Sequence, residues 1–440
     1  MGAVRPQTPH RSPRQAFGGR EKKMRVGEGC EKFNSADVDA NRLFEMALGL
    51  GSGWKVAKSE MDVDSRELKI WLDFAPGSQF ACPQCGEFCP VHDTVEKRWR
   101  HMDFWQHRTE LIARVPRSRC EDHGVLVVDV PWARSGSGFT LMMEAVVLLL
   151  CQEMSVSAAA EHLGEHDTRL WRVLEHYVME AHAAKSWKSV RRILVDETSA
   201  RRGHRYVTTV VDADSRELLF LCEGRESQAL RLFAKELERH GASARQIELV
   251  CMDMSPAYRK GVREFFPQAT VVFDRFHLMQ MAGKALDEVR KTLRREGADL
   301  QNGLWALRGN QWTRTQEQQV LRRELCQQYP RLGRAMMLRD IFQDILADED
   351  TESLSWWCAR AMRSRLEPFK KLAASIQEHW QGVTAFMKTR ITNGLIEAIN
   401  GLLQLAKRLA RGFRSFKNFQ IMAYLKAANL KLNIPTLSPT

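Results

Sequence analysis

The chain has 440 residues, which is enough for about three domains at roughly 150 residues each. Hydrophobic residues make up 44% and charged residues 27%, which excludes a wholly disordered or fibrous chain. The formal net charge of +12 favours a polyanionic partner, either nucleic acid or a membrane surface. The longest uninterrupted apolar run, Ala145 to Cys151, is far shorter than the ~20 residues of a membrane span, so we expect no membrane partner.

Residues 1–40 are rich in Arg, Pro, Gly and Ser and lack apolar periodicity. They predict a disordered basic tail, or a start codon placed too early, with Met24 as one later candidate. The segment has no apolar stretch of the kind found in secretory signals, so we expect a cytoplasmic protein. Its ten cysteines would then be reduced, and closely spaced cysteines would indicate metal binding.

The segment 41–135 predicts a zinc-binding module. Residues 54–74 alternate in polarity as strands do, and two pairs of metal-ligand side chains follow. These are Cys82, Cys85, Cys120 and His123. A two-residue gap lets one turn supply two ligands of a tetrahedral structural Zn²⁺ site, and a Gly after each pair permits the positive φ of such a turn. Cys89 and His92 lie close by and could replace a ligand, which leaves the identity of the fourth ligand open. The alternative to a zinc site is that Cys120 is an ordinary buried thiol and His123 a surface histidine.

The segment 136–187 predicts a helix-turn-helix domain. Residues 154–163 form a short helical pattern that ends at Gly164, and a second helix starts near His166 with Asp167 as its N-cap. Helices joined by a tight Gly turn are typical of DNA-reading modules, although any helical hairpin has this pattern. The side chains expected to face a DNA groove are Thr168, Arg169 and Arg172.

The segment 188–425 predicts a ribonuclease-H-like α/β domain. Strands at 193–196, 204–212 and 218–222 are followed by a helix at 227–240 and a strand at 247–253. In a ribonuclease-H-like sheet, three consecutive antiparallel strands are followed by a helix and by a fourth strand that returns parallel to the first. The first and fourth strands are then neighbours in the sheet. Asp196 and Asp253, each predicted at a strand end, would then lie side by side.

Two adjacent carboxylates repel, and divalent metal relieves the repulsion. Phosphodiester chemistry uses two ions about 3.5–4 Å apart, and Mg²⁺ (or Mn²⁺) suits all-oxygen ligands. Glu397 is the candidate third ligand, in the first turn of a helix capped by Thr392 or Asn393 and reaching Gly412. Glu397 has no base three or four residues later, so its alternative role is a favourable interaction with the helix dipole.

The same helix has two predicted faces. The buried stripe comprises Leu395, Ile396, Ile399, Leu402, Leu403, Ala406 and Leu409. The opposite face carries Glu397, Asn400, Gln404, Lys407, Arg408 and Arg411. From Ile391 to the C-terminus, seven basic residues accompany one acid, which places half of the net charge there. We expect Lys407, Arg408 and Arg411 to bind DNA phosphates.

Other residues are alternatives to these candidates. Glu197 and Asp274 also lie next to strand ends, whereas Asp212 and Asp214 are expected only in a turn. Residues from about 279 to 388 are helical in period and form an insertion before Glu397. Its tryptophans are expected in the helical core rather than as base-stacking platforms: Trp305, Trp312, Trp356 and Trp357.

From about Leu43 to Asn418, nearly its whole length, the chain resembles the ISL-three transposases of bacterial insertion sequences. The matching segments, in family order, are FEMALGL, CPQCG, KRWRHMDFWQHRTELIARVPRSRC, EDHG, VPWA, VDETSARRGHRYVTTVVD, VCMDMSPAY, FPQATVVFDRFHL and NGLIEAINGLLQLAKRLARGFRSFKNF. The resemblance implies a zinc finger, a helix-turn-helix and an Asp-Asp-Glu catalytic domain interrupted by a helical insertion. The motif positions place the triad at Asp196, Asp253 and Glu397, and the zinc ligands at Cys82, Cys85, Cys120 and His123. The first forty residues have no counterpart in the family pattern.

The resulting hypothesis is a multidomain α+β, Mg²⁺-dependent DNA transposase with a C-terminal tail at 426–440. It would bind the double-stranded DNA of terminal inverted repeats, cut at the element's ends and join the freed 3′-OH to target DNA. A homo-oligomer would hold two ends together, in the bacterial cytoplasm and on the nucleoid when bound. The rival hypotheses are a ribonuclease-H-like nuclease or resolvase that does not join DNA, and a DNA-binding repressor without enzymatic activity.

Overall fold

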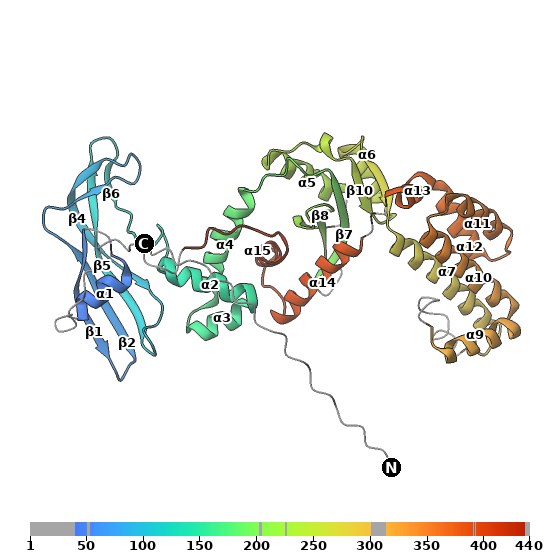
Figure 1. Ribbon diagram of the computed structural model, residues 1–440, viewed down its shortest axis with the longest axis horizontal. Coiled ribbons are helices and arrows are strands. Elements are labelled where there is room, and N and C mark those ends of the chain that lie inside the picture. The colour runs from blue at the N-terminus through green and yellow to red at the C-terminus, as the bar shows by residue number, and fades with distance from the viewer. Residues whose placement is uncertain are drawn as a thin grey trace, which may run out of the picture.

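The computed structural model describes residues 40–50, 53–201, 205–224, 227–300, 314–389, 391 and 393–435. The expected basic tail before residue 40, Trp305, Trp312 and Thr392 lie outside the described residues. From the N-terminus, the chain forms a β-sheet module, a three-helix unit, an α/β domain and a helical insertion (Figure 1). None of the described helices combines the length and the apolar character that crossing a membrane requires. The domain boundaries expected from the sequence stay predictions.

The N-terminal module is a twisted sheet preceded by one helix. Its elements are α1 (Ala40–Leu48), β1 (Trp54–Asp62), β2 (Glu67–Phe74), β3 (Gln79–Ala81), β4 (Phe88–Arg100), β5 (Arg108–Cys120) and β6 (Gly124–Val127). The strand order is β1-β2-β5-β4-β3, with β6 paired to β5. Leu68, Ile70 and Leu72 are buried on one face of β2, as the alternating pattern predicts. The hairpin of β5 and β6 and the turn between β3 and β4 carry the paired cysteine motifs.

Three helices follow the sheet: α2 (Leu141–Glu153), α3 (Val156–Leu163) and α4 (Asp167–Ala183). Gly164 ends α3 in the left-handed conformation with a φ of 62°, which a residue without a Cβ adopts at no steric cost. The N-cap of α4 is His166, whose ring accepts a hydrogen bond from the backbone N–H of Thr168. The prediction of Asp167 as the cap is therefore wrong by one residue, because the preceding imidazole supplies the acceptor and Asp167 begins the helix.

The α/β domain contains a five-stranded sheet. Its strands are β7 (Arg192–Arg201), β8 (Arg205–Asp212), β9 (Leu218–Glu223), β10 (Leu249–Met252) and β11 (Thr270–Phe273). The order is β11-β10-β7-β8-β9: β10 runs parallel to β7 and β11, whereas β7, β8 and β9 are antiparallel. This is the predicted ribonuclease-H-like arrangement, with the first and fourth strands as neighbours.

One strand is longer than predicted. β7 continues past Asp196 to Arg201, because β8 pairs with it beyond that point, from Asp196 opposite Thr209 to Arg201 opposite Arg205. Asp196 therefore lies in the middle of a strand, and the expectation that it ends one is wrong. Its backbone is fixed by the ladder rather than by a turn.

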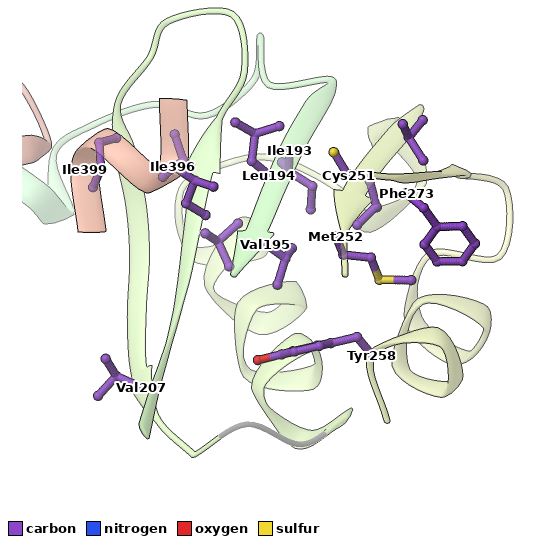
Figure 2. Close-up of a cluster of buried hydrophobic side chains, with 14 of the residues drawn as sticks. Ile193, Leu194, Val195, Val207, Cys251, Met252, Tyr258, Phe273, Ile396 and Ile399 are labelled. Atoms are coloured by element: carbon purple, nitrogen blue, oxygen red, sulfur yellow. The ribbon is translucent and has the colours of Figure 1, made fainter. Parts of the chain in front are cut away.

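Helices cover both faces of this sheet. They are α5 (Ser227–Arg239), α6 (Pro256–Phe265), α14 (Gly394–Leu409) and α15 (Phe416–Ala427). Figure 2 shows Tyr258 of α6 and Ile396 of α14 with Val195 in one buried cluster. The Tyr258 hydroxyl lies 2.8 Å from Thr208 Oγ1. Alternation along β7 sends Asp196 towards α14, and the neighbouring Glu197 towards Tyr258 on the other face.

The insertion is a helical body beside the sheet (Figure 1), as its helical period predicts. Its described helices are α7 (Arg275–Arg295), α9 (Gln316–Gln328), α10 (Pro330–Asp348), α11 (Thr351–Arg363), α12 (Glu367–Glu378) and α13 (Trp380–Thr389). Trp357 is buried and stacks on Phe342, as expected. Trp356 is 51% exposed, so its assignment to the core is wrong: neighbouring residues of a helix point in different directions, and only one reaches the interior.

Candidate active site and zinc cluster

Two aspartates meet at the boundary of β7 and β10. The parallel register pairs Cys251 with Leu194, and its continuation brings Asp253 level with Asp196. Asp253 lies directly after β10, where its Oδ1 accepts a hydrogen bond of 2.9 Å from the backbone N–H of Ser255. The sheet therefore brings together the two carboxylates that the sequence predicts to be neighbours.

The carboxylate of Asp196 is held by an amide from α14. Asn400 Nδ2 donates a hydrogen bond of 2.8 Å to Asp196 Oδ2, and Asn400 Oδ1 accepts one of 3.2 Å from Thr209 Oγ1. Burial raises the pKa of Asp196, and the negative charge of Asp253 adds to this effect. The hydrogen bond from Asn400 and the charge of His277 act in the opposite direction without outweighing burial.

Glu397 approaches the same place from the first turn of α14. Burial raises the pKa of Glu397, and the negative charges of Asp274 and Asp196 raise it further. Asp196 is thus coupled electrostatically to both Asp253 and Glu397. Within the described part of the chain, the three carboxylates do not form a group whose oxygens all lie within 4.8 Å of one another. Asp196, Asp253 and Glu397 therefore lie on one side of the sheet, but their carboxylate oxygens are not all within metal-sharing distance of one another.

Asp274, an alternative candidate, is engaged as the N-cap of α7. Burial alone would raise the pKa of Asp274, but hydrogen bonds from His277 and from the backbone N–H of Asn393 outweigh burial and lower it. Asp274 in turn raises the pKa of His277, whose Nδ1 lies 3.2 Å from Asp274 Oδ2. The negative charges of Asp196 and Asp253 also raise the pKa of His277, so the imidazole lies close enough to both aspartates to interact with them electrostatically. Sequence reasoning missed its role; its position three residues after a strand-end aspartate was the available signal.

Other acidic residues lie elsewhere. Glu197 points to the opposite face of the sheet, where it interacts with the Tyr258 hydroxyl. Asp212 accepts hydrogen bonds from the backbone N–H groups of Asp214 and Ser215, at 3.2 and 3.3 Å. Asp212 and Asp214 therefore form the expected turn. Asn393 occupies the N-cap position of α14, but its side chain makes no capping hydrogen bond among the described residues, so the predicted cap is not formed by Asn393.

The polar side of α14 faces the sheet more closely than predicted. Gln404 Nε2 donates to Thr198 Oγ1 at 2.8 Å, and Lys407 Nζ donates to the carbonyl oxygen of Ser199 at 2.7 Å. The extension of β7 beyond Asp196 supplies these acceptors. The predicted buried stripe is correspondingly wrong at its outer positions, since Leu402 is 38% and Leu409 61% exposed. Of the basic residues expected to bind phosphate, Arg408 and Arg411 are exposed, whereas Lys407 already binds the chain's own backbone.

A compact thiol and imidazole cluster lies at the edge of the N-terminal sheet. It consists of Cys82, Cys85, Cys120 and His123, whose ligand atoms all lie within 4.8 Å of one another. Cys85 Sγ lies 3.7 Å from Cys120 Sγ, and two sulfurs bound to one zinc ion at about 2.3 Å would lie about 3.8 Å apart. The donor set therefore fits Zn²⁺.

The turns of the cluster explain its spacing. Gly86 and Gly124 have φ values of 78° and 74°, in the left-handed region expected for the turn after each ligand pair. Cys89, an alternative ligand, instead directs its thiol to the carbonyl oxygen of Glu87 at 3.4 Å, and His92 is exposed. Both lie outside the four-residue cluster.

The three residues expected to face a DNA groove differ in whether their side chains already contact the rest of the protein. Arg169 forms an ion pair with Glu165, donates to the carbonyl oxygen of Gly138 at 2.8 Å and lies over the ring of Phe139. It is therefore tied to the scaffold, and its expected place in a DNA groove conflicts with these contacts. Thr168 and Arg172 are exposed on α4, as a groove-facing position requires.

Glu165 also joins two modules. Besides Arg169, it accepts hydrogen bonds from Arg100 Nε at 3.1 Å and Arg108 Nη2 at 2.9 Å. Arg100 and Arg108 belong to strands β4 and β5 of the N-terminal sheet. The side chains of Glu165 and Arg100 are each only 3% exposed, so the ion pair is shielded from solvent.

Known proteins match this chain along most of its length. A family model described as a transposase, of the DDE type in family ISL3, matches residues 193–423. A model for the helix-turn-helix domain of transposase family ISL3 matches residues 128–178, and one for the zinc finger of the IS204/IS1001/IS1096/IS1165 transposases matches residues 78–123. These matches fall in turn on the α/β domain, the three-helix unit and the thiol cluster.

Two curated relatives span nearly the whole chain. The transposase for insertion sequence element IS1557 of Mycobacterium tuberculosis is 29% identical over 438 residues, covering 90% of this chain and 97% of the relative. The transposase for IS1001 of Bordetella parapertussis is 27% identical over 393 residues, covering 85% and 95%. Because the catalytic family model alone covers more than half of the residues and its matched segment contains the carboxylate site, the chain belongs to the ISL3 family of DDE-type insertion-sequence transposases.

Proposed function

We propose that this transposase binds the terminal inverted repeats of its element, cleaves at the element's ends and transfers the 3′-OH strand into target DNA. Asp196, Asp253 and Glu397 are the proposed catalytic residues and the ligands of two Mg²⁺ or Mn²⁺ ions. The observation that carries the proposal is the convergence of three carboxylates from β7, β10 and α14 on one side of the sheet.

The donor set fits hard divalent cations. All three ligands are carboxylates, and Mg²⁺ prefers oxygen ligands. Bound ions would activate the attacking oxygen and stabilise the leaving one. Asp196 is coupled to both other carboxylates, so it suits the position shared by two ions. Asn400 orients the Asp196 carboxylate by donating to Oδ2.

DNA binding would involve several surfaces. We assign the zinc module, with Cys82, Cys85, Cys120 and His123 as ligands of a structural Zn²⁺, and the helix-turn-helix to recognition of the terminal repeats. Thr168 and Arg172 are the exposed candidates for groove contacts, and Arg408 and Arg411 for phosphate contacts next to the triad. A homo-oligomer would bring two DNA ends together, in the cytoplasm and on the nucleoid.

A strand-transfer assay on terminal-repeat DNA tests the triad. We expect Asp196→Asn, Asp253→Asn and Glu397→Gln to retain repeat binding and to lose both cleavage and joining. Glu248→Gln is a matched control, because Glu248 is exposed just before β10 and lies away from the site; it should keep full activity. Full activity in Asp196→Asn or Asp253→Asn would contradict the assignment.

The products of the same assay separate the rival functions. Cleaved ends without joined product would indicate a nuclease or resolvase. Repeat binding without cleavage in any divalent metal, unaffected by triad substitutions, would indicate a repressor.

A further inference from the structure

A second group of metal-ligand side chains lies between the helix-turn-helix unit and the α/β domain. His182 belongs to the last turn of α4, Glu236 to α5, and His240 directly follows α5. One ligand atom of each lies within 4.8 Å of the others, and both histidines are buried. The three residues play no part in the proposed transposition chemistry.

Hydrogen bonds to backbone carbonyls show which nitrogen of each imidazole ring carries a hydrogen. His240 Nδ1 lies 2.6 Å from the carbonyl oxygen of Lys185, and His182 Nε2 lies 3.0 Å from that of Leu219. A carbonyl oxygen can only accept, so these two nitrogens carry the hydrogens, and in the neutral rings the other nitrogen keeps its lone pair. Histidines that bind metals typically donate their second nitrogen to a backbone carbonyl in this way.

The remaining distances fit a shared ion better than a direct contact. His240 Nε2 lies 3.5 Å from Glu236 Oε1, which is longer than the 2.7–3.2 Å typical of an N–H···O hydrogen bond. Two ligand atoms bound to one zinc at about 2.0–2.1 Å in a tetrahedral arrangement would lie about 3.4 Å apart. The rings of His182 and His240 have centroids 4.9 Å apart and planes at 83°. Two imidazoles on one tetrahedral zinc would place their centroids about 5 Å apart.

Aromatic neighbours hold both rings in place. His240 stacks on Trp187, with centroids 3.7 Å apart and planes at 11°, and His182 stacks on Tyr424, with centroids 4.0 Å apart and planes at 20°. The ligands are therefore oriented before any ion binds.

We propose that His182, Glu236 and His240 bind a second structural Zn²⁺, which joins the helix-turn-helix unit to the α/β domain. Two imidazoles and one carboxylate form a donor set that zinc uses in proteins. A water molecule or the second oxygen of Glu236 completes the tetrahedron. The ion would tie α4 to α5 and so fix the orientation of the DNA-reading helix relative to the catalytic sheet. This inference does not depend on the proposed reaction.

Zinc content of the purified full-length protein after dialysis tests the site. Elemental analysis should find two zinc ions per chain in the natural sequence, and one in both Cys82→Ser/Cys85→Ser and His182→Gln/His240→Gln. His176→Gln should keep two, because His176 is exposed on the same helix. One zinc ion per chain in the natural sequence, unchanged by His182→Gln/His240→Gln, would overturn the proposal.

X-ray absorption at the zinc edge on the unmodified protein gives an answer that does not depend on whether the variants fold. The thiol cluster alone offers three sulfur ligands and one nitrogen ligand. The second site would add two nitrogen ligands and at least one oxygen ligand. We expect nitrogen and oxygen ligands to outnumber sulfur ligands in the averaged shell. A shell of three sulfurs to one nitrogen would exclude the second site.

Discussion

The side-chain amide of Asn400 donates a hydrogen bond of 2.8 Å to Oδ2 of Asp196, from a residue 204 positions further along the chain. This contact ties α14 to the middle of β7 and fixes the orientation of the Asp196 carboxylate. It joins the helix that carries Glu397 to the strand that carries Asp196, so two of the three proposed ligands are positioned by one interaction.

Asn400→Ala should lower strand-transfer activity by about 10–100-fold, the usual cost of removing a residue that orients a metal ligand. The half-saturating Mg²⁺ concentration should rise in the same variant. Gln404→Ala is the matched control, because Gln404 lies one turn further along α14 and bonds to Thr198 and Ser199 rather than to a carboxylate. Equal losses in both variants would show that Asn400 acts only through packing of the helix.

The stability provided by His277 should depend on pH. Its pKa is raised above the ordinary value of 6.5 by hydrogen bonding to Asp274, so the protonated ring stabilises the fold below that value. This contribution is lost as the pH rises through the raised pKa. Without divalent metal, His277→Gln should therefore lower Tm more at about pH 6 than at about pH 9.

Differential scanning fluorimetry across this range measures the effect, with His176→Gln as the control at an exposed position. Asp274, the carboxylate partner of His277, loses its own stabilising contribution only at a much lower pH. The pKa of Asp274 lies below the ordinary 3.8, so its own contribution persists until the pH falls through that lowered value. A Tm difference that is the same at both ends of the range would contradict the ion pair.

Glu165→Ala should destabilise the junction between the zinc module and the helix-turn-helix. Removing this carboxylate leaves the buried guanidinium of Arg100 with the half-exposed carboxylate of Asp103 as its ion-pair partner. Breaking a buried ion pair from one side typically costs about 3–5 kcal/mol, and we expect a loss at the lower end of that range because Asp103 remains. Urea unfolding measures the loss. Glu161→Ala, four residues earlier and exposed, should change the free energy of unfolding little. A similar small effect for Glu165→Ala would show that the junction does not depend on this pair.

Charge reversal at Arg408 and Arg411 should weaken DNA binding and reduce its dependence on salt. Each lost phosphate contact should lower the slope of log K against log salt concentration by about 0.9. Lys407→Gln should alter the slope less, because Lys407 already donates to the carbonyl oxygen of Ser199. An unchanged slope after reversal of both arginines would remove their assignment as phosphate contacts.

The sheet order could be predicted because it depends on local patterns. Runs of apolar residues and the turn at Asp212 define three antiparallel strands, and a helix before Leu249 requires the next strand to return parallel. This order alone brings Asp253 to Asp196. The thiol cluster was similarly accessible, since its ligands come in pairs with glycines at the turns.

Features that depend on distant partners could not be predicted. The residues of β7 after Asp196 are too polar to indicate a strand, and their pairing with β8 decides their conformation. That extension then draws Gln404 and Lys407 inwards, which no pattern within α14 reveals. His182 lies in α4 and His240 directly follows α5, so their proximity appears only when the end of α4 lies near the end of α5.

The hydrogen bond from the backbone N–H of Asn393 to Asp274 Oδ1, 2.9 Å long, has a mechanical consequence. Asp274 begins α7, the first helix of the insertion, and Asn393 immediately precedes α14, so the chain leaves and re-enters the sheet at one pinned point. The structure of the sheet therefore does not depend on the length of the insertion between Asp274 and Asn393. A tilt of the insertion about this contact would act on the first turn of α14, which carries Glu397, the proposed third metal ligand.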